Sequence, residues 1–142
     1  MGVNTSDFAE NHALLAKLAN TSFSGEINLS SYVDVSKYNR IAIVLYALAV
    51  GSSLDCDIEV SAAAAGTSPR TVKSITQLDG ADDGAVVLID VQASELPANG
   101  IDYRYLNVEL TPSGSTSAVV LVFGFEPRYE PVDQTSYAEV VS

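Results

Sequence analysis

A strict alternation of apolar and polar side chains over residues 54–62 restricts the fold more than any other pattern in the chain. The apolar residues are Leu54, Cys56, Ile58, Val60 and Ala62, and those between them are Asp55, Asp57, Glu59 and Ser61. Successive side chains of a β-strand point to opposite faces of a sheet. This period of two therefore predicts a strand with one face in a core and an acidic face in water.

A second segment, residues 118–131, joins an apolar strand to an abrupt end. The six apolar residues from Ala118 to Phe123 predict a strand that is covered on both faces. Glu126-Pro127 ends the strand, because proline has no N–H for strand pairing and restricts the residue before it.

Short β-segments follow one another from residue 26 onward, without crossover helices. We predict them at residues 26–29, 32–35, 40–50, 70–78, 85–91 and 101–111. The polar segment 70–78 is predicted as an edge strand, and 85–91 as a buried one. Near Tyr105 the apolar residues change from one set of alternate positions to the other, which predicts a bulge in this strand. Seven or eight such strands indicate an all-β protein with a single antiparallel β-sandwich, of jelly-roll or immunoglobulin-like strand order.

Residues 7–19 have the best helical pattern in the chain. Asp7 is placed to cap the first turn, and Glu10 follows three residues later, as in a capping box. Phe8 and Leu15 fall near one face of this helix, which we expect to dock on a neighbouring subunit or on its own domain.

The chain is expected to form one domain with two extensions, since it has 142 residues. These parts are an N-terminal arm (1–24) with a short helix, the β-sandwich (25–131) and an extended C-terminal tail (132–142). Hydrophobic residues make up 47% of the chain, charged residues only 18%, and the mean hydropathy is +0.20. We therefore expect some apolar surface to be buried against other copies or another protein.

The charge balance argues against two classes of partner. Seven basic and 18 acidic residues give a net charge of −11, which disfavours nucleic acid and anionic membranes. The single cysteine, Cys56, allows no intrachain disulfide, and residues 1–20 have no basic leader pattern. The longest apolar run, residues 41–50, is too short to span a bilayer. We expect the protein to be made and folded in a cytosol.

The sequence gives little support for catalysis or a cofactor. His12 is the only histidine and lies in the predicted helix, where a surface position is expected. One Cys and one His do not make the ligand set of a zinc site. Cys56 is most simply a small core residue whose thiol is kept protonated by nearby carboxylates. We expect no enzyme activity and no cofactor.

Three groups of residues are candidates for binding or catalytic sites. Asp79, Asp82 and Asp83 offer oxygen ligands for calcium, but they lack EF-hand spacing, and a solvated turn is the preferred interpretation. The carboxylates on the acidic face of residues 54–62 recur about every 7 Å, within the range of a catalytic pair, yet a solubilising face explains them better. Tyr103 and Tyr105 are candidates for a sugar-stacking face or for an oligomer contact.

The chain resembles the small β-sandwich decoration (cement) proteins of tailed-bacteriophage heads, over about residues 25–132. The matching segments, in order, are residues 38–49, 54–66, 71–75, 90–111 and 117–131. The last contains the Pro-Arg-Tyr element that begins at Pro127, and the glycine usual before it is replaced here by Phe125-Glu126. The likeness is one of strands and turns and includes no catalytic motif.

This resemblance implies a virion protein on the outer capsid surface, assembled in the bacterial host cytoplasm. The implied partners are the major capsid protein and further copies of the chain, as a homotrimer. The candidate interface residues are Phe8, Leu15, Tyr103, Tyr105, Arg128, Tyr129 and Tyr137. Two alternatives stay open: a connector, tail or fibre-base component of the virion, and a carbohydrate-binding module.

Overall fold

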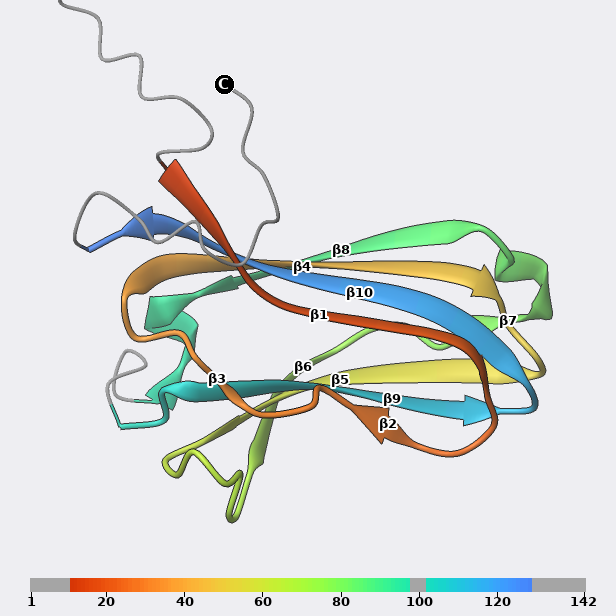
Figure 1. Cartoon of the computed structure of the whole chain (residues 1–142), viewed down its shortest axis with the longest axis horizontal. Coiled ribbons are helices and arrows are strands. Elements are labelled where there is room, and N and C mark those ends of the chain that lie inside the picture. The colour runs from red at the N-terminus through yellow and green to blue at the C-terminus, as the bar shows by residue number, and fades with distance from the viewer. Residues whose placement is uncertain (1–10, 98–101, 129–142) are drawn as a thin grey trace, which may run out of the picture.

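The computed structural model describes residues 11–97 and 102–128, which form two β-sheets packed face to face (Figure 1). The strands are β1 (His12–Phe23), β2 (Ile27–Asn28), β3 (Val33–Asp34), β4 (Tyr38–Ala49), β5 (Ser53–Ser61), β6 (Arg70–Ser74), β7 (Leu78–Asp79), β8 (Ala85–Gln92), β9 (Tyr105–Ser113) and β10 (Thr116–Pro127). Two 3-10 turns, η1 (Gly80–Asp82) and η2 (Ala93–Glu95), flank β8. The predicted antiparallel β-sandwich is confirmed.

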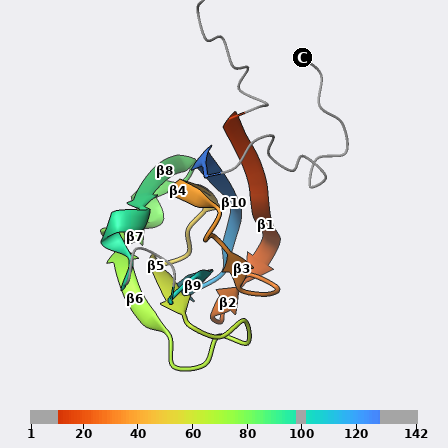
Figure 2. The ribbon, with the colours of Figure 1, turned by 90° about the vertical axis from the view of Figure 1, so that its left-hand side faces the viewer.

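The strand order of the two sheets identifies the topology. One sheet has the order β1-β10-β4-β8, and the other has the order β2-β9-β5-β6, with β3 also pairing with β9 and β7 with β5. The chain passes from one sheet to the other at most of its connections. Its first and last described strands, β1 and β10, are neighbours in the same sheet. This is the order of a jelly roll, one of the two alternatives that the sequence left open. Seen from the end, the sheets curve around the core, with β1 on one side and β6 and β8 on the other (Figure 2).

The core lies between the sheets and takes alternate residues from the long strands. Its largest fully buried side chains are Ile41, Ile43, Leu45, Leu54, Ile58, Val60, Val91, Leu106, Val108, Leu110, Val120 and Val122. Cys56 lies among them, and its pKa is raised to about 12 by burial and then by the charges of Asp57 and Glu109. The interpretation of Cys56 as an unreactive core residue is confirmed.

Residues 12–23 form strand β1, so the predicted helix over residues 7–19 is wrong from residue 12 onward; residues 7–10 lie outside the described residues. β1 runs antiparallel along β10, from the pair His12–Phe125 to the pair Phe23–Thr116. Without β1, that side of β10 would leave a row of backbone groups unpaired. Pairing with β10 therefore outweighs the helix propensity of this Ala- and Leu-rich segment.

Two further predictions are corrected. Residues 85–91 are not a buried strand but most of β8, at the edge of its sheet, because only β4 pairs with it among the described strands. The expected bulge near Tyr105 is absent from the described part, where β9 pairs with β5 in unbroken register from Tyr105 to Ser113. The parity change in the sequence arises because β9 begins at Tyr105, and Tyr103 precedes the strand. The polar edge strand is confirmed as β6, at the end of the other sheet.

Candidate binding surfaces

Six apolar side chains form two rows on the outer face of the sheet β1-β10-β4-β8, and we call this set the apolar grid. One row contains Leu121, Val44 and Leu88, and the other contains Val119, Tyr46 and Val86. Cross-strand pairing places the members of each row directly side by side. The exposed fraction is 40% for Tyr46, 64% for Val86, 68% for Leu88 and 43% for Leu48, which lies farther along β4. Large apolar side chains gathered in this way mark a candidate contact surface.

The apolar grid explains why the central strands are apolar on both sides. In β10 the inner residues Ala118, Val120 and Val122 are buried, whereas Val119 and Leu121 of the grid are only half-buried. Their outer side is thus not covered by another layer of the described residues, although the sequence predicted cover on both faces. Burial of this side against another molecule would complete the cover that the apolar pattern requires.

The opposite sheet presents an acidic outer face with an open groove of about 520 Å³. We call this the acidic groove. Its floor contains Glu59 of β5 together with Asn107 and Glu109 of β9, and its walls are residues 29–32 and part of the segment between β5 and β6. The two faces of the sandwich therefore differ strongly in polarity.

A chain of hydrogen bonds fixes the floor of the acidic groove. The Leu29 backbone N–H donates to Asn107 Oδ1 over 3.1 Å, and Asn107 Nδ2 donates to Asn28 Oδ1 over 2.7 Å. Asn28 Nδ2 then donates to Glu26 Oε1 over 3.1 Å. Asn107 is only 2% exposed, so its amide is held in one orientation by these partners.

One wall of the acidic groove depends on the contact between Tyr32 and Gly66. Gly66 has a φ of +79°, and a Cβ atom there would lie 2.3 Å from the Tyr32 ring. Because glycine has no Cβ atom, it can adopt this backbone conformation and also lets the Tyr32 ring pack closely against it. Ser61 holds the same segment, because its hydroxyl donates to the Thr67 carbonyl over 2.6 Å. Burial and the negative charge of Glu59 raise the pKa of Tyr32.

Glu59 and Glu109 form a hydrogen-bonded pair of carboxyl groups in the acidic groove. The hydrogen bond with Glu59, then burial, and then the charges of Glu59, Glu26 and Asp57 raise the pKa of Glu109 to about 7. Two carboxyl groups that share a hydrogen bond need a proton between them. Glu109 is thus expected to change its charge near neutral pH.

This pair predicts a pH dependence of stability. The ordinary pKa of Glu109 is 4.5 and its value in the folded protein is about 7, so the folded chain binds more protons than the unfolded chain between these values. Stability should then fall as pH rises through this window, by about 1 to 2 kcal/mol after allowance for solvent screening. Glu109→Gln should flatten the decline between pH 5 and 8, as measured by urea unfolding.

Asp55→Asn is the matched control for this measurement, since Asp55 lies on the same face and accepts a hydrogen bond from Gln77 at 3.1 Å. It should leave the slope between pH 5 and 8 unchanged. Asp34 does not interfere in this window: burial opposes its ionisation, but hydrogen bonds from Arg104 and Ser36 prevail and lower its pKa to about 2. An undiminished slope in Glu109→Gln would show that the pair does not control it.

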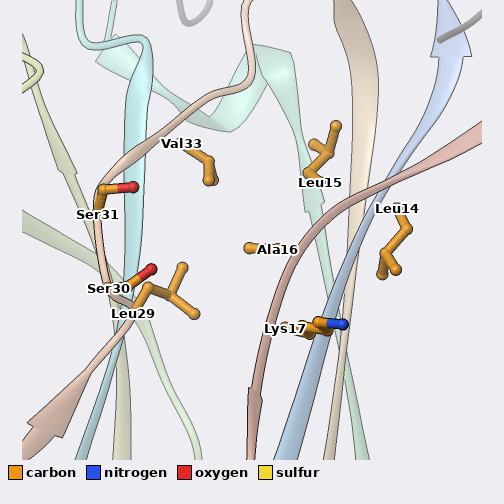
Figure 3. A pocket seen from close by; sticks show the side chains of 8 residues that line it. All are labelled: Leu14, Leu15, Ala16, Lys17, Leu29, Ser30, Ser31 and Val33. Carbon is orange, nitrogen blue, oxygen red and sulfur yellow. The ribbon is translucent and has the colours of Figure 1, made fainter. Parts of the chain in front are cut away.

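A smaller pocket of about 350 Å³ opens where β1 meets the segment between β2 and β3. The register of β1 shifts between Leu14 and Ala16, so Leu15 has no partner on β10. Leu15 and Ala16 line one side of the pocket, and Leu29 and Val33 line the other (Figure 3). Leu15, predicted as an interface residue on a helix, thus lies in a strand bulge beside a pocket of mixed polarity.

The three calcium candidates lie in the turn around η1 and are used as turn residues. Asp79 Oδ1 accepts from the Ala81 N–H over 2.8 Å, and Asp82 Oδ2 accepts from the Asp79 N–H over 2.9 Å. Asp83 Oδ1 accepts from the Val50 N–H over 2.7 Å. Within the described residues, no group of three or more His, Cys, Asp or Glu side chains is arranged to hold a metal ion.

Tyr103 and Tyr105 each pack with a different arginine. The Arg70 guanidinium lies 4.5 Å from the Tyr103 ring centre, and that of Arg104 lies 5.5 Å from the Tyr105 ring centre. Arg104 also forms an ion pair with Asp34. Tyr105 lies on the outer face of β9, two residues before Asn107 of the acidic groove, whereas Tyr103 lies outside the strand.

Arg128 is the described member of the predicted C-terminal contact. Its backbone N–H donates to the Lys37 carbonyl over 2.8 Å, and its Nε donates to Asn39 Oδ1 over 3.1 Å. These contacts hold the chain beside the beginning of β4 as it leaves β10. Phe8, Tyr129 and Tyr137 lie outside the described residues.

His12 was expected on the surface of a helix but is buried in β1. Its ring stacks at 5.7 Å from the Phe125 ring and lies 5.9 Å from that of Phe123. No helix within residues 11–97 and 102–128 has the length and apolar character needed to cross a membrane.

Comparisons with family models and with curated proteins gave no match. Among solved structures, the chain is similar to a carbohydrate-binding module specific for non-crystalline cellulose, CBM28. The identity is 9% and the TM-score 0.48, over 79% of this chain and 74% of that one. Similarity at this level does not indicate what the present chain binds.

Proposed function

We propose that the protein is a non-enzymatic virion component that binds the outside of a tailed-bacteriophage head and cements adjacent capsid subunits. The observation that carries the proposal is the apolar grid on one face of the sandwich, opposite an acidic face. A protein that assembles as several copies on a shell needs an apolar side for contacts between the copies and a polar side that stays in water. The resemblance to head decoration proteins is the reason for proposing a phage head as this shell.

In this proposal the apolar grid is the contact between copies of the chain within a homotrimer. Val86 and Leu88 lie on the edge strand β8, where another copy has free access to side chains and backbone. The trimer then contacts several capsid subunits at once, and such multivalent attachment strengthens binding without a single tight site. Internal DNA pressure must break these bridges before the shell opens.

The end of β10 carries the Pro-Arg element of the proposed capsid contact. Decoration proteins of this kind usually have glycine before the Pro-Arg element, where this chain has Phe125-Glu126. Glu126 adopts a φ of +50°, in the left-handed region that favours glycine. Arg128, just beyond, is the proposed contact with the capsid protein.

Sedimentation with phage heads that lack decoration tests this function. Purified protein is expected to sediment with the heads and to protect them against heat or a chelator. Arg128→Ala should weaken binding about tenfold while leaving the thermal unfolding of the free protein nearly unchanged. Failure of the wild-type protein to bind heads would contradict the proposal, and only a few copies per particle would favour the connector alternative.

A carbohydrate-binding module is the second candidate. It is favoured by the row of Tyr105, Asn107 and Glu109 along the outer face of β9, which offers an aromatic ring, an amide and a carboxyl group. Binding on a glycan array that is abolished by Tyr105→Ala would support this role over assembly.

A further inference from the structure

Strand β1 forms one edge of its sheet, and its side away from β10 is open. Among the described strands only β10 pairs with β1, and no other backbone hydrogen bond within the described residues reaches β1 between Leu14 and Leu18. This edge is long and largely apolar, with Lys17 as the only lysine, arginine or acidic residue of the strand. An edge of this kind is a template on which a further strand can pair.

The pocket beside the β1 bulge opens on this same edge. It is lined by residues 14–17 of β1 and, on the other side, by residues 29–31 and Val33 from the segment between β2 and β3 (Figure 3). Its volume is about 350 Å³. Side chains of a strand alternate between the two faces of a sheet, so a strand added to β1 would place one side chain over this pocket and the next on the outer face.

Lys17 supplies a charge on the outer face of the edge. It pairs with Leu121 of the apolar grid and is exposed. None of the ion pairs within the described residues includes Lys17. The occupant that fits the edge is therefore an extended segment with an acidic residue for Lys17 next to an apolar residue for the pocket.

The C-terminal tail contains such a segment, at residues 135–141, which lie outside the described residues. Its sequence is Thr-Ser-Tyr-Ala-Glu-Val-Val, and Thr, Tyr and Val favour strands. Glu139 and Val140 are neighbours, so in a strand their side chains point to opposite faces. With Glu139 beside Lys17, Val140 lies over the pocket.

The end of β10 leaves the tail within reach of this edge. Arg128 is seven positions beyond Leu121, the partner of Lys17, which corresponds to about 23 Å along the sheet. The open side of β1 is two strand spacings from β10, or about 10 Å across the sheet. Residues 129–139 span up to about 36 Å when extended, which exceeds the direct distance of about 25 Å.

We propose that residues 135–141 pair with the open edge of β1 as a further strand, with Glu139 beside Lys17 and Val140 over the pocket. β10 ends where β1 begins, so a tail that turns back there runs parallel to β1. The occupant is the tail of the same chain, because the short tether gives it an effective concentration on the order of millimolar. This inference does not depend on the function proposed above.

Hydrogen exchange of the full chain, followed by NMR, tests the pairing. Amide groups of residues 14–18 that point away from β10 should exchange at least about 30-fold more slowly than in an unstructured chain. Nuclear Overhauser contacts should join Val140 to Ala16. Both signs should persist on about 25-fold dilution, because the strand comes from the same chain.

Substitutions in the tail locate the contact. Val140→Asp should speed the exchange of these β1 amides at least about tenfold, since it places a carboxylate over the pocket. Val132→Asp makes the same change in the tail but outside the pairing segment, and it should alter the exchange less than about twofold. Amides of β4 and β5 should exchange as in the wild type in both variants.

A charge exchange tests the register. Lys17→Glu and Glu139→Lys should each speed the exchange of the β1 amides about threefold, because like charges then face each other. The double variant restores opposite charges and should return the exchange to within about twofold of the wild type.

Three results would overturn the proposal. The first is exchange of the open-edge amides at the rate of an unstructured chain, which would show that Lys17 and the bulge only protect a free edge. The second is an equal effect of Val132→Asp and Val140→Asp. The third is loss of protection on dilution, which would assign the added strand to a second copy.

Discussion

Ala13→Asp is expected to destabilise the protein by about 3 kcal/mol, whereas Ala19→Asp should change its stability by less than about 0.5 kcal/mol. Both residues belong to β1. Ala13 pairs with Gly124 on the inner face and is 2% exposed, whereas Ala19 pairs with Val119 on the outer face and is exposed. The first substitution buries a carboxyl group without a partner, and the second places it in water.

The two interpretations of this segment predict opposite patterns. On the helix expected from the sequence, Ala19 shares the apolar face with Phe8 and Leu15, and Ala13 points away from it. A helical arm would therefore tolerate Asp at position 13 better than at position 19. Urea unfolding of the two variants measures the difference directly. Equal effects, or a larger loss at position 19, would contradict the pairing of β1 with β10.

Val86→Lys combined with Leu88→Lys is expected to convert the proposed homotrimer into monomers and to weaken the proposed head binding at least about 100-fold. Each apolar side chain of this size contributes about 1.5–3 kcal/mol when buried in a contact, and a lysine in its place also has to be desolvated. The loss for two positions exceeds about 2.8 kcal/mol, which corresponds to a factor of 100. Analytical ultracentrifugation gives the oligomeric state, and sedimentation with heads gives the affinity.

The matched control places the same charges on the opposite sheet. Thr111→Lys combined with Ser113→Lys changes two exposed positions of β9 and should leave assembly unchanged. Both double variants should unfold within about 1 kcal/mol of the wild type, since the four positions are on the surface. A Val86/Leu88 variant that still assembles as the wild type does would remove the apolar grid from the interface.

Local pattern was sufficient to predict much of the sandwich. The alternation at residues 54–62 became β5, with Leu54, Cys56, Ile58 and Val60 in the core. Ala62 is exposed beyond the end of the strand, and Glu59 and Ser61 are buried on the face predicted to lie in water. Local pattern was insufficient for β1, because the apolar residues of this segment fit either one face of a helix or a bulged strand. The segment is a strand because it pairs with the edge of β10. Local pattern was insufficient for β8 too, since an edge strand that is apolar on both faces has the same sequence as a buried one.

The candidate surfaces required the tertiary structure for a different reason. The apolar grid combines residues of three strands, and only their register shows that Val44 lies between Leu121 and Leu88. Glu59 was seen as part of a solubilising face, but Glu109 reaches it only because β9 lies next to β5. The alternation of inward and outward positions within each strand predicts that these side chains point outward. It could not give the strand order.

A reconstruction by cryo-electron microscopy of phage heads saturated with the purified protein tests the central claim most directly. The proposal predicts ordered density on the outside of the head, with the apolar grid buried against a neighbouring copy and the acidic face of β5 and β9 turned away from the shell. Heads without added density, or density in which the grid faces solvent while the acidic face contacts the shell, would contradict it.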